Sequence, residues 1–492
     1  MHGVEKSDPP VVARSPANKA AVAAAEPGER RGGTEENADP QSTVRTRSRA
    51  AVSQARARIR GAVTRNRKEK LTALLHHVGV DVLRAGFLSL RRAAAPGVDG
   101  MTWERYAEDL EANLADLHAR VHAGAYRALP SRRRYIPKAD GRRRPLGIAA
   151  LEDKAVQAAV VMLLTPVFEA EFLGFSYGFR PGRGQHDALD ALAYGIGKRR
   201  INWVLDADIR SFFDTISHDW LVRFVEHRIG DRRIVRLIRK WLAAGVLEEG
   251  RRIETVEGTP QGAVISPFLA NVYLHYVYDL WVRRWRHRHA TGDMIVVRYA
   301  DDTIVGFEHR RDAELFLRDL AGRLARFGLD LHPGKTRLIE FGRHAIARRR
   351  ARGLGKPETF AFLGFTHYCA TRRSGGGFVL GRTPVRERMR AKLREIKERL
   401  RATRHDGAEA QGRWLGQVLR GWLAYYAVPM SAPAITAFRH HVVERWLHAL
   451  RRRGQRHRLP WRRMRVLAER YLPFPRILHP WPEQRFLVTH PR

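Results

Sequence analysis

Residues 296–307 read VVRYADDTIVGF, and the two adjacent carboxylates in this stretch decide how the chain is interpreted. Asp301 and Asp302 stand between two short apolar runs, each typical of a buried strand. This pattern predicts a tight hairpin with both acids at or near its turn. Neighbouring carboxylates repel each other, which should cost stability unless a cation binds between them.

A third candidate carboxylate ends another apolar run. In WVLDADIRSFFD, residues 203–214, Asp208 follows the apolar residues. Mg²⁺ prefers oxygen ligands and is usually held by one or two carboxylates together with substrate phosphates. Three converging carboxylates would suit two-metal phosphoryl transfer, in which the ions activate an attacking hydroxyl and stabilise a leaving pyrophosphate. On spacing alone, a helix N-cap or a surface acid explains Asp208 equally well.

Composition narrows the class of partner and the compartment. The 492 residues carry a formal net charge of +39, which is expected of a protein that holds a polyanion such as nucleic acid. The single cysteine, Cys369, excludes a disulfide framework and a cysteine-cluster zinc site, and it fits a reducing cytoplasm. We find no apolar run of about 18 residues and no signal-peptide pattern, so we expect no membrane association and no secretion.

The character of the chain changes along its length. Residues 1–66 are rich in Ala, Pro, Gly, Arg and Glu and contain no aromatic residue, which predicts a disordered basic arm. Helical periodicity follows to about residue 127, then short β-branched runs alternate with helical segments to about residue 368, an α/β or α+β pattern. After residue 377 the pattern is helical and strongly basic. Residues 371–492 contain 28 Arg and Lys, 8 Asp and Glu, and five of the eleven Trp.

The motif RYADD resembles the Y-x-D-D box of reverse transcriptases, and the chain from about Leu71 onward resembles bacterial group II intron-encoded reverse transcriptase/maturases. Further blocks follow in the family's order: RRRYIPKADGRRRPLGIAALEDKAVQ, GFSYGFRPGRGQHDAL, DADIRSFFD, GTPQGAVISPFLANVYLH, GLDLHPGKTRLIEFG and FAFLGF. The resemblance implies an α+β right-hand polymerase fold, with fingers and palm followed by an α-helical thumb and maturase domain. It implies an N-terminal extension and fingers in residues 67–200, a palm in 201–370, and the thumb and maturase domain in 371–492.

The resemblance also implies roles for individual residues. The catalytic and metal-binding residues, for two Mg²⁺ ions, are Asp208, Asp301 and Asp302. The nucleotide-binding residues, with Phe213 as the gate against a 2′ hydroxyl, are Lys138, Arg144, Phe213 and Gln261. The template and primer contacts are Arg180, Gly262, Tyr299 and Lys335. A Lys point charge and an Arg fork on a hairpin are physically suited to gripping a triphosphate.

The C-terminal quarter indicates which branch of the family is resembled. LRGWLAYYAVP, residues 419–429, is similar to the maturase motif L-x-G-W-x-x-Y and implies intron-RNA contacts from Arg420, Gly421, Trp422 and Tyr425. Aromatic residues interleaved with arginine suit stacking on unpaired bases, although about half of the Trp would serve a helical core instead. No Cys pairs or His-rich ligand pattern follow Trp461, so we expect no endonuclease domain.

Three functions remain to be compared. The first is an RNA-directed DNA polymerase that copies group II intron RNA and assists its splicing and mobility, with intron RNA, an RNA template, a DNA primer, dNTPs and target DNA as partners in the bacterial cytoplasm and nucleoid. The second is the same polymerase recruited to defence or spacer acquisition. The third is a non-enzymatic splicing factor, and the intact Asp208, Asp301 and Asp302 argue against it. The intron, the DNA target and the oligomeric state are open at this stage.

Overall fold

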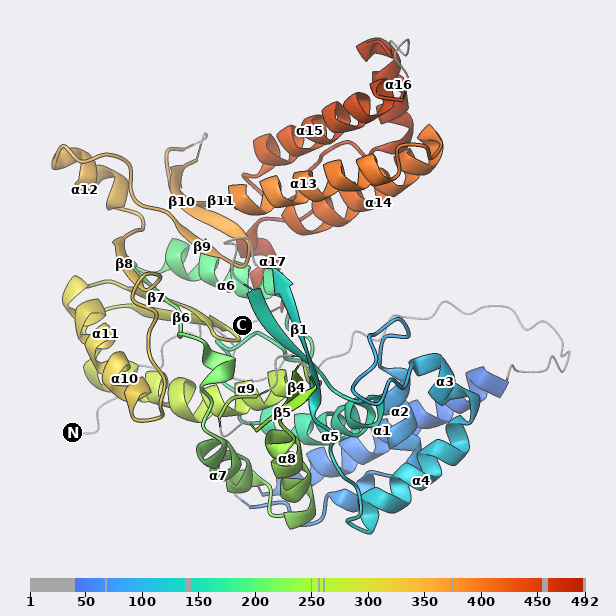
Figure 1. Ribbon diagram of the computed structural model, residues 1–492. Helices are drawn as coiled ribbons and strands as arrows, with labels where there is room; N and C mark the ends of the chain where they lie inside the picture. The colour runs from blue at the N-terminus through green and yellow to red at the C-terminus, as the bar shows by residue number, and fades with distance from the viewer. Residues whose placement is uncertain are drawn as a thin grey trace, which may run out of the picture.

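The structure is a computed structural model of an α+β protein, which confirms the predicted fold class (Figure 1). It describes residues 40–66, 69–137, 143–248, 250–254, 257–259, 262–372, 375–453 and 459–489. Figure 1 shows a body of sheets and helices, from which a bundle made by α13, α14, α15 and α16 stands away.

A four-stranded antiparallel sheet, the palm sheet, lies in the middle of the body. Its strands run in the order β6-β7-β3-β8. The strands are β3 (Trp203–Ala207), β6 (Met294–Tyr299), β7 (Asp302–Phe307) and β8 (Arg337–Glu340). Strands β3, β6 and β7 are mostly apolar because both faces of the sheet are covered there.

Alternate residues of the palm strands enter two separate hydrophobic cores, as the two-residue period of a strand requires. On one face, Leu205, Val296 and Val305 belong to the core shared with the helices of the palm and the N-terminal half. On the other face, core residues such as Val204 and Ile304 pack with α6 (Gln185–Lys198) and with the C-terminal helices. The helices on the palm side are α7 (His218–Arg228), α8 (Arg232–Ala243), α9 (Ser266–Leu274), α10 (Leu280–His289) and α11 (Arg310–Ala325).

A second sheet, the fingers sheet, has the order β2-β1-β4-β5. Its strands are β1 (Ser131–Pro137), β2 (Arg143–Ile148), β4 (Val246–Glu248) and β5 (Arg251–Ile253). The predicted boundary at residue 200 separates α6 from the palm strand β6, on which α6 packs. The helical elements before and beneath the fingers sheet are η1 (Leu75–His77), α2 (Val80–Leu88), α3 (Trp103–Glu108), α4 (Leu110–His122) and α5 (Leu151–Glu169).

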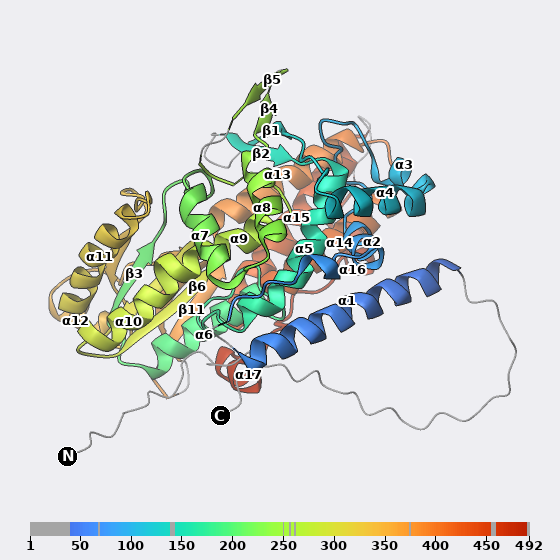
Figure 2. The same cartoon turned by 90° about the horizontal axis from the view of Figure 1, so that it is seen from below.

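The expected disorder of residues 1–66 is wrong for their last part, because Pro40–Arg65 form the helix α1. Ala55, Ile59 and Val63 recur every four residues, are buried, and lie on a helix that packs against α2 and α5 (Figure 2). This narrow apolar stripe is too small a share of the segment to alter its composition, so a compositional argument misses it. The remainder of the predicted arm, residues 1–39, lies outside the described residues.

The C-terminal region begins with a small sheet and continues as helices. The sheet β11-β10-β9 contains β9 (Phe360–Phe362), β10 (Phe365–Thr371) and β11 (Phe378–Pro384), and the short helix α12 (Ala345–Ala351) precedes it. The helices that follow are α13 (Arg386–Ala402), α14 (Ala408–Tyr426), α15 (Ala432–Arg451), α16 (Trp461–Tyr471) and α17 (Pro482–Thr489). None of the helices in the described part of the chain combines the length and apolarity that crossing a bilayer demands.

Helix α17 returns from the bundle to the palm and packs on α6 (Figure 1). The buried carboxylate of Asp190 on α6 binds Arg485 of α17 and, at 3.2 Å, Arg382 of β11. The rings of Tyr194 and Phe486 stack with their centroids 4.5 Å apart. Two ion pairs on one carboxylate thus join α6, the small sheet and α17.

We predict that acid destabilises the fold through its buried histidines. Burial lowers the pKa of His367 to about 3 and that of His275 to about 4, against an ordinary 6.5. The unfolded chain therefore binds protons that the folded chain does not, and stability falls as pH drops from about 6.5 toward 4. His367 stacks flat on Phe360 at 4.8 Å, so H367F keeps the packing and removes the titration. Between pH 7.5 and 5, H367F should lose about 2 kcal/mol less unfolding free energy than the wild type. Equal losses in urea titrations would contradict this.

Candidate catalytic site and nucleic-acid groove

The two adjacent acids occupy the predicted hairpin. Strands β6 and β7 pair up to Tyr299 and Asp302, leaving Ala300 and Asp301 as a two-residue loop. Ala300 has φ 55°, the left-handed conformation that two-residue hairpin loops favour. Gly178 lies against this loop so closely that a Cβ there would be 2.3 Å from the Ala300 nitrogen. The loop is therefore tight, and a neighbouring segment supports it.

Asp208 reaches the hairpin through the sheet register. Ala207 of β3 pairs with Thr303 of β7, so the next residue, Asp208, comes opposite Asp302. Part of the Asp302 side chain is exposed, but protein surrounds its carboxyl, and this burial raises the pKa of Asp302 to about 7. The negative charges of Asp301, Asp208 and Asp206 contribute in the same direction. The structure thus gathers the three carboxylates on which the sequence argument depends.

Asp206 is a fourth acid in this cluster, which sequence reasoning missed. Burial, and then the charge of Asp208, raise the pKa of Asp206 to about 6, while Arg337 opposes the shift. The sequence feature that could have revealed Asp206 is the D-x-D spacing in residues 206–208, because residues two apart on a strand share a face.

The carboxylates fit a metal that arrives with its substrate better than a preformed cage. Among the residues that the structure describes, no three His, Cys, Asp or Glu side chains are arranged to hold an ion by themselves. The ammonium of Lys335 lies 2.7 Å from Oδ2 of Asp208 and supplies positive charge there. Mg²⁺ characteristically completes its shell with substrate phosphates and water, so this open set suits it. Lys335, predicted to lie near the primer or nucleotide, is placed directly at the carboxylates.

The predicted nucleotide-binding residues are only partly described. Lys138 and Gln261 lie outside the described residues, and of Arg144 only the backbone, paired with Ile136 in the fingers sheet, is described. Phe213 is half-buried in a 3₁₀ turn, Phe212–Asp214, just after Asp208. Its carbonyl accepts a hydrogen bond from the Thr259 N–H at 2.7 Å. This bond ties the turn to the segment that leads to Gly262.

Gly262, predicted to lie near the template and primer, packs closely against another part of the protein. Its φ is 115°, and a Cβ on it would lie 2.7 Å from the Gly147 carbonyl of β2 and 2.9 Å from the Leu146 side chain. Any larger residue would push the fingers sheet away from this segment. The absence of a side chain therefore serves the contact between fingers and palm.

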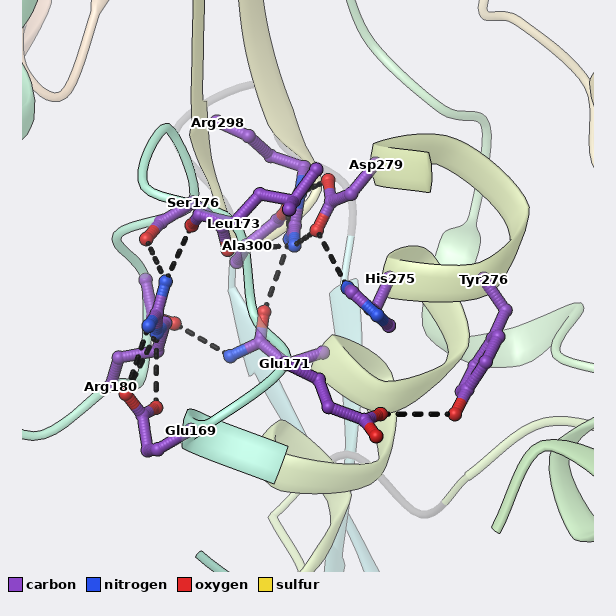
Figure 3. A network of polar contacts seen from close by, with 12 residues as sticks. Glu169, Glu171, Leu173, Ser176, Arg180, His275, Tyr276, Asp279, Arg298 and Ala300 are labelled. Atoms are coloured by element: carbon purple, nitrogen blue, oxygen red, sulfur yellow. Dashed lines mark hydrogen bonds and ion pairs between the residues drawn. The ribbon is translucent and has the colours of Figure 1, made fainter. Parts of the chain in front are cut away.

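The expectation that Arg180 contacts the template is wrong, because its guanidinium points into the protein (Figure 3). It donates to the Glu169 carboxylate at 2.9–3.2 Å and to the carbonyls of Leu173 and Ser176 at 2.8 and 2.7 Å. Only 5% of the residue is exposed. The template role was implied by the resemblance of the surrounding block, and a sequence motif does not show whether an arginine in it is exposed or buried.

Arg298, one residue before Tyr299, is a second buried arginine and was also missed (Figure 3). Its guanidinium binds both oxygens of Asp279 at 2.7 and 2.6 Å, and it donates to the Ala300 carbonyl at 2.9 Å. It also donates to Asn271 Oδ1 and Ser176 Oγ. The sequence feature that could have revealed this buried residue is a lone arginine inside the apolar run VVRY. Arg298 fixes the hairpin loop to α9, to the π-helical turn His275–Asp279 and to the 176–180 segment.

Beside Arg180, Phe179 faces the opposite way. It is 53% exposed and has φ 57°, a conformation that costs a non-glycine residue about 1–3 kcal/mol. Its ring centroid lies 6.5 Å from that of Tyr299. The side chain of Tyr299 lies next to that of Gln185 at the start of α6.

Gln185 also lines an open groove of about 470 Å³ between α6, α13 and α14. Its other lining residues are Arg388, Lys392, Gln417, Val418, Gly421, Trp422, Tyr425 and Tyr426. Three of the four predicted maturase residues thus border the groove, whereas Arg420 is exposed outside it. Trp422 also belongs to the helical core, where it stacks on Phe438.

Two protein families match the chain in order. The family described as "Reverse transcriptase (RNA-dependent DNA polymerase)" matches residues 136–367, which include the palm and all the carboxylates above. The family described as "Group II intron, maturase-specific domain" matches residues 386–467, from the start of α13 into α16.

Individual relatives agree with these matches. Protein YkfC of Escherichia coli (strain K12) is 34% identical over 303 residues, 54% of this chain and 79% of YkfC. Group II intron-encoded protein LtrA of Lactococcus lactis subsp. cremoris is 42% identical over 188 residues, 38% of this chain and 31% of LtrA. An uncharacterized 91 kDa protein in the cob intron of Schizosaccharomyces pombe is 43% identical over 146 residues, 30% of this chain and 18% of that protein. The chain spans most of YkfC but less than a third of the other two.

We predict that the Arg298–Asp279 pair determines whether the hairpin is held in place. R298M leaves the fully buried Asp279 carboxylate without its main partner and should cost about 3–5 kcal/mol of unfolding free energy. The double variant R298M/D279L removes both charges and should recover a large part of this loss. Urea unfolding of the wild type, both single variants and the double variant measures the coupling. Additive losses would contradict a direct interaction.

Proposed function

Because the chain belongs to the family of reverse transcriptases that carry a group II intron maturase domain, we propose that it copies intron RNA into DNA and assists the splicing and mobility of that intron. The observation that carries the polymerase proposal is the meeting of Asp208 with Asp301 and Asp302 at the end of the palm sheet. The maturase match favours an intron role over recruitment to defence or spacer acquisition. The intact carboxylates favour an enzyme over a splicing factor that only binds RNA.

Reverse transcriptases use divalent metal ions, and we propose two Mg²⁺ ions held by Asp208, Asp301 and Asp302. A metal held there would supply Lewis acidity that lowers the pKa of the primer 3′ hydroxyl and would neutralise charge on the departing pyrophosphate. The residues of this chain hold the reacting groups in place. The Lys335 ammonium neutralises part of the carboxylate charge. From this position it would also contact a phosphate of the incoming nucleotide or primer.

We propose that the fingers sheet supplies the nucleotide contacts. Lys138 and Arg144 would grip the triphosphate of the dNTP, and Gln261 would lie beside them. The contact of Gly262 with β2 supports this, because it holds the fingers sheet next to the segment that precedes α9. Phe213, half-buried just beyond Asp208, would pack under the sugar and exclude a 2′ hydroxyl.

We propose that the helical bundle holds RNA, with Arg420, Gly421, Trp422 and Tyr425 among its contacts. The groove beside α6 would take the RNA template and DNA primer, close to Tyr299 and Gln185. The distal surface, where α16 carries the exposed Arg462, Arg463 and Arg465, would contact intron RNA (Figure 1). We also propose that the protein acts in the cytoplasm, where nucleoid DNA is the target for insertion of the intron.

The polymerase proposal predicts that single carboxylate changes abolish copying. D208N and D302N should reduce extension of a DNA primer on an RNA template to below about 1% of wild type, because metal binding depends on these groups. RNA binding should change little. D116N, an exposed acid on α4, serves as the matched control. Primer extension resolved on denaturing gels measures this. Copying by both variants above a few per cent would refute the assignment.

The maturase proposal predicts separate losses of RNA binding and copying. The triple variant R462Q/R463Q/R465Q on α16 should weaken binding of the intron RNA and flatten the slope of log K against log salt by roughly 0.7–0.9 per lost phosphate contact. Copying of an unrelated primed template should persist, since the catalytic carboxylates are unchanged. R310Q/R311Q/R318Q removes three exposed arginines from α11 as a charge-matched control. Parallel loss of binding and copying, with an unchanged salt slope, would instead indicate a bundle that only completes the thumb.

A further inference from the structure

A second open groove, the α12 groove, lies between α12 and the far ends of β10 and β11, with a volume of about 820 Å³. In Figure 1, α12 and the β10–β11 hairpin project at the upper left, away from the helices that precede the fingers sheet. Phe365, at the start of β10, packs on Tyr425 of the groove beside α6, whereas Thr371, at the end of β10, lines the α12 groove. A strand rises about 3.3 Å per residue, so about 20 Å of β10 separates the two grooves.

The two family matches assign no role to the hairpin wall of this groove. They cover residues 136–367 and 386–467, so the wall formed by residues 370–378 lies between them. The helical wall, α12, lies within the first match but far along the chain from the residues that meet at the carboxylates. The α12 groove is therefore a part of the surface that the proposed function has not used.

The helical wall is strongly basic and has little compensating charge. Residues 341–356 contain five Arg and one Lys but no Asp or Glu. Within the described part of the chain, their one ion pair joins Arg352 to Glu340. Arg343 donates to the Gly197 carbonyl at 2.9 Å, a neutral partner that leaves its charge uncompensated. Because like charges repel, such a wall is favoured when a polyanion lies against it.

The groove also has an apolar lining, which a surface that only attracts counter-ions does not need. Phe378 is half-buried and Ile346 is 37% exposed, and both line the groove. On the hairpin wall, a Cβ on Gly376 or Gly377 would meet no atom within 4 Å, so nothing obstructs the approach of a ligand there. Unpaired bases present flat apolar faces, whereas the bases of a duplex are stacked on one another. Arginines beside an aromatic ring therefore favour unpaired nucleotides.

We propose that the α12 groove binds an unpaired stretch of RNA, with Arg343 and Arg350 against its phosphates and Phe378 stacked on a base. Charge and lining favour a single-stranded nucleic acid. The choice of RNA over DNA rests on the proposed function, in which intron RNA is the partner during both splicing and copying. The groove is separate from the catalytic carboxylates and from the arginines of α16. It therefore holds RNA without taking part in nucleotide addition.

Photo-cross-linking can detect RNA in this groove separately from RNA on the other basic surfaces. The probe is a short uridine-rich RNA with one 5-iodouridine, which light joins to an aromatic ring in contact with it. Trypsin releases Phe378 in the peptide of residues 374–382, whose labelling is measured by mass spectrometry. R343Q/R350Q should reduce this labelling at least about fivefold and flatten its log–log salt dependence by roughly 0.7 per lost phosphate contact.

R311Q/R318Q removes two exposed arginines from α11 and is the charge-matched control, which should label the peptide as the wild type does. Labelling of peptides from the helical bundle should be the same in all three proteins. Arg343 and Arg350 are exposed, so R343Q/R350Q should keep the wild-type thermal midpoint. It should also copy an unrelated primed template as the wild type does, because the catalytic carboxylates are unchanged.

No labelling of residues 374–382 in the wild type, or equal labelling in R343Q/R350Q, would overturn the proposal. Equal labelling by single-stranded DNA of the same sequence would overturn the choice of RNA, and equal labelling by the RNA annealed to its complement would overturn the choice of unpaired nucleotides. Primer extension by the same preparation tests the polymerase function separately. A wild type that labels the peptide without copying would refute that function and still support the RNA site.

Discussion

The buried guanidinium of Arg298 is the interaction on which the geometry of the active site depends. It joins Asp279 and Asn271 to Ser176 and to the carbonyl of Ala300 within the hairpin loop. A charge this deeply buried is tolerated only when its donors are bound and its counter-ion is close. The π-helical turn at His275–Asp279 is where α9 gives way to α10, and it supplies that counter-ion. The carboxylates can therefore crowd together, because the loop that carries them is held from behind.

The palm sheet limits where charge can gather. Its residues alternate between two hydrophobic cores, so an ionised side chain in mid-strand would face an apolar layer on either side. Asp208, Asp301 and Asp302 lie at the strand ends. Arg298, within β6, is tolerated because the buried carboxylate of Asp279 binds it. Even at the strand ends, burial of the carboxyl and the charges of Asp301, Asp208 and Asp206 raise the pKa of Asp302. The same crowding that opposes folding thus favours metal binding, and the fold provides the stability that the site itself lacks.

Much of this architecture was predictable because the local spacing of apolar and charged residues determines it. The hairpin followed from two apolar runs around an acid pair, and the helical C-terminal region followed from apolar residues that recur every three or four positions between Val385 and Leu400. What the sequence did not disclose depends on distant partners. Whether Arg180 meets solvent or Glu169 is decided by tertiary packing, and α1 is ordered by a stripe too sparse to register in its composition. Arg298 and Asp206 were overlooked because the role of a charged side chain within a strand depends on its tertiary contacts, which the sequence alone does not show.

The docking of α17 on α6 has a mechanical consequence for the helical bundle. The chain leaves the body through β11 into α13 and rejoins it at α17, where Asp190, Tyr194 and their partners hold it. A bundle attached by one connection could swivel about that connection. The helices of the bundle also share a hydrophobic core with the palm sheet, so these contacts together oppose rotation of the bundle relative to the groove beside α6. A duplex that leaves the carboxylates would therefore meet the bundle in the same orientation during each nucleotide addition.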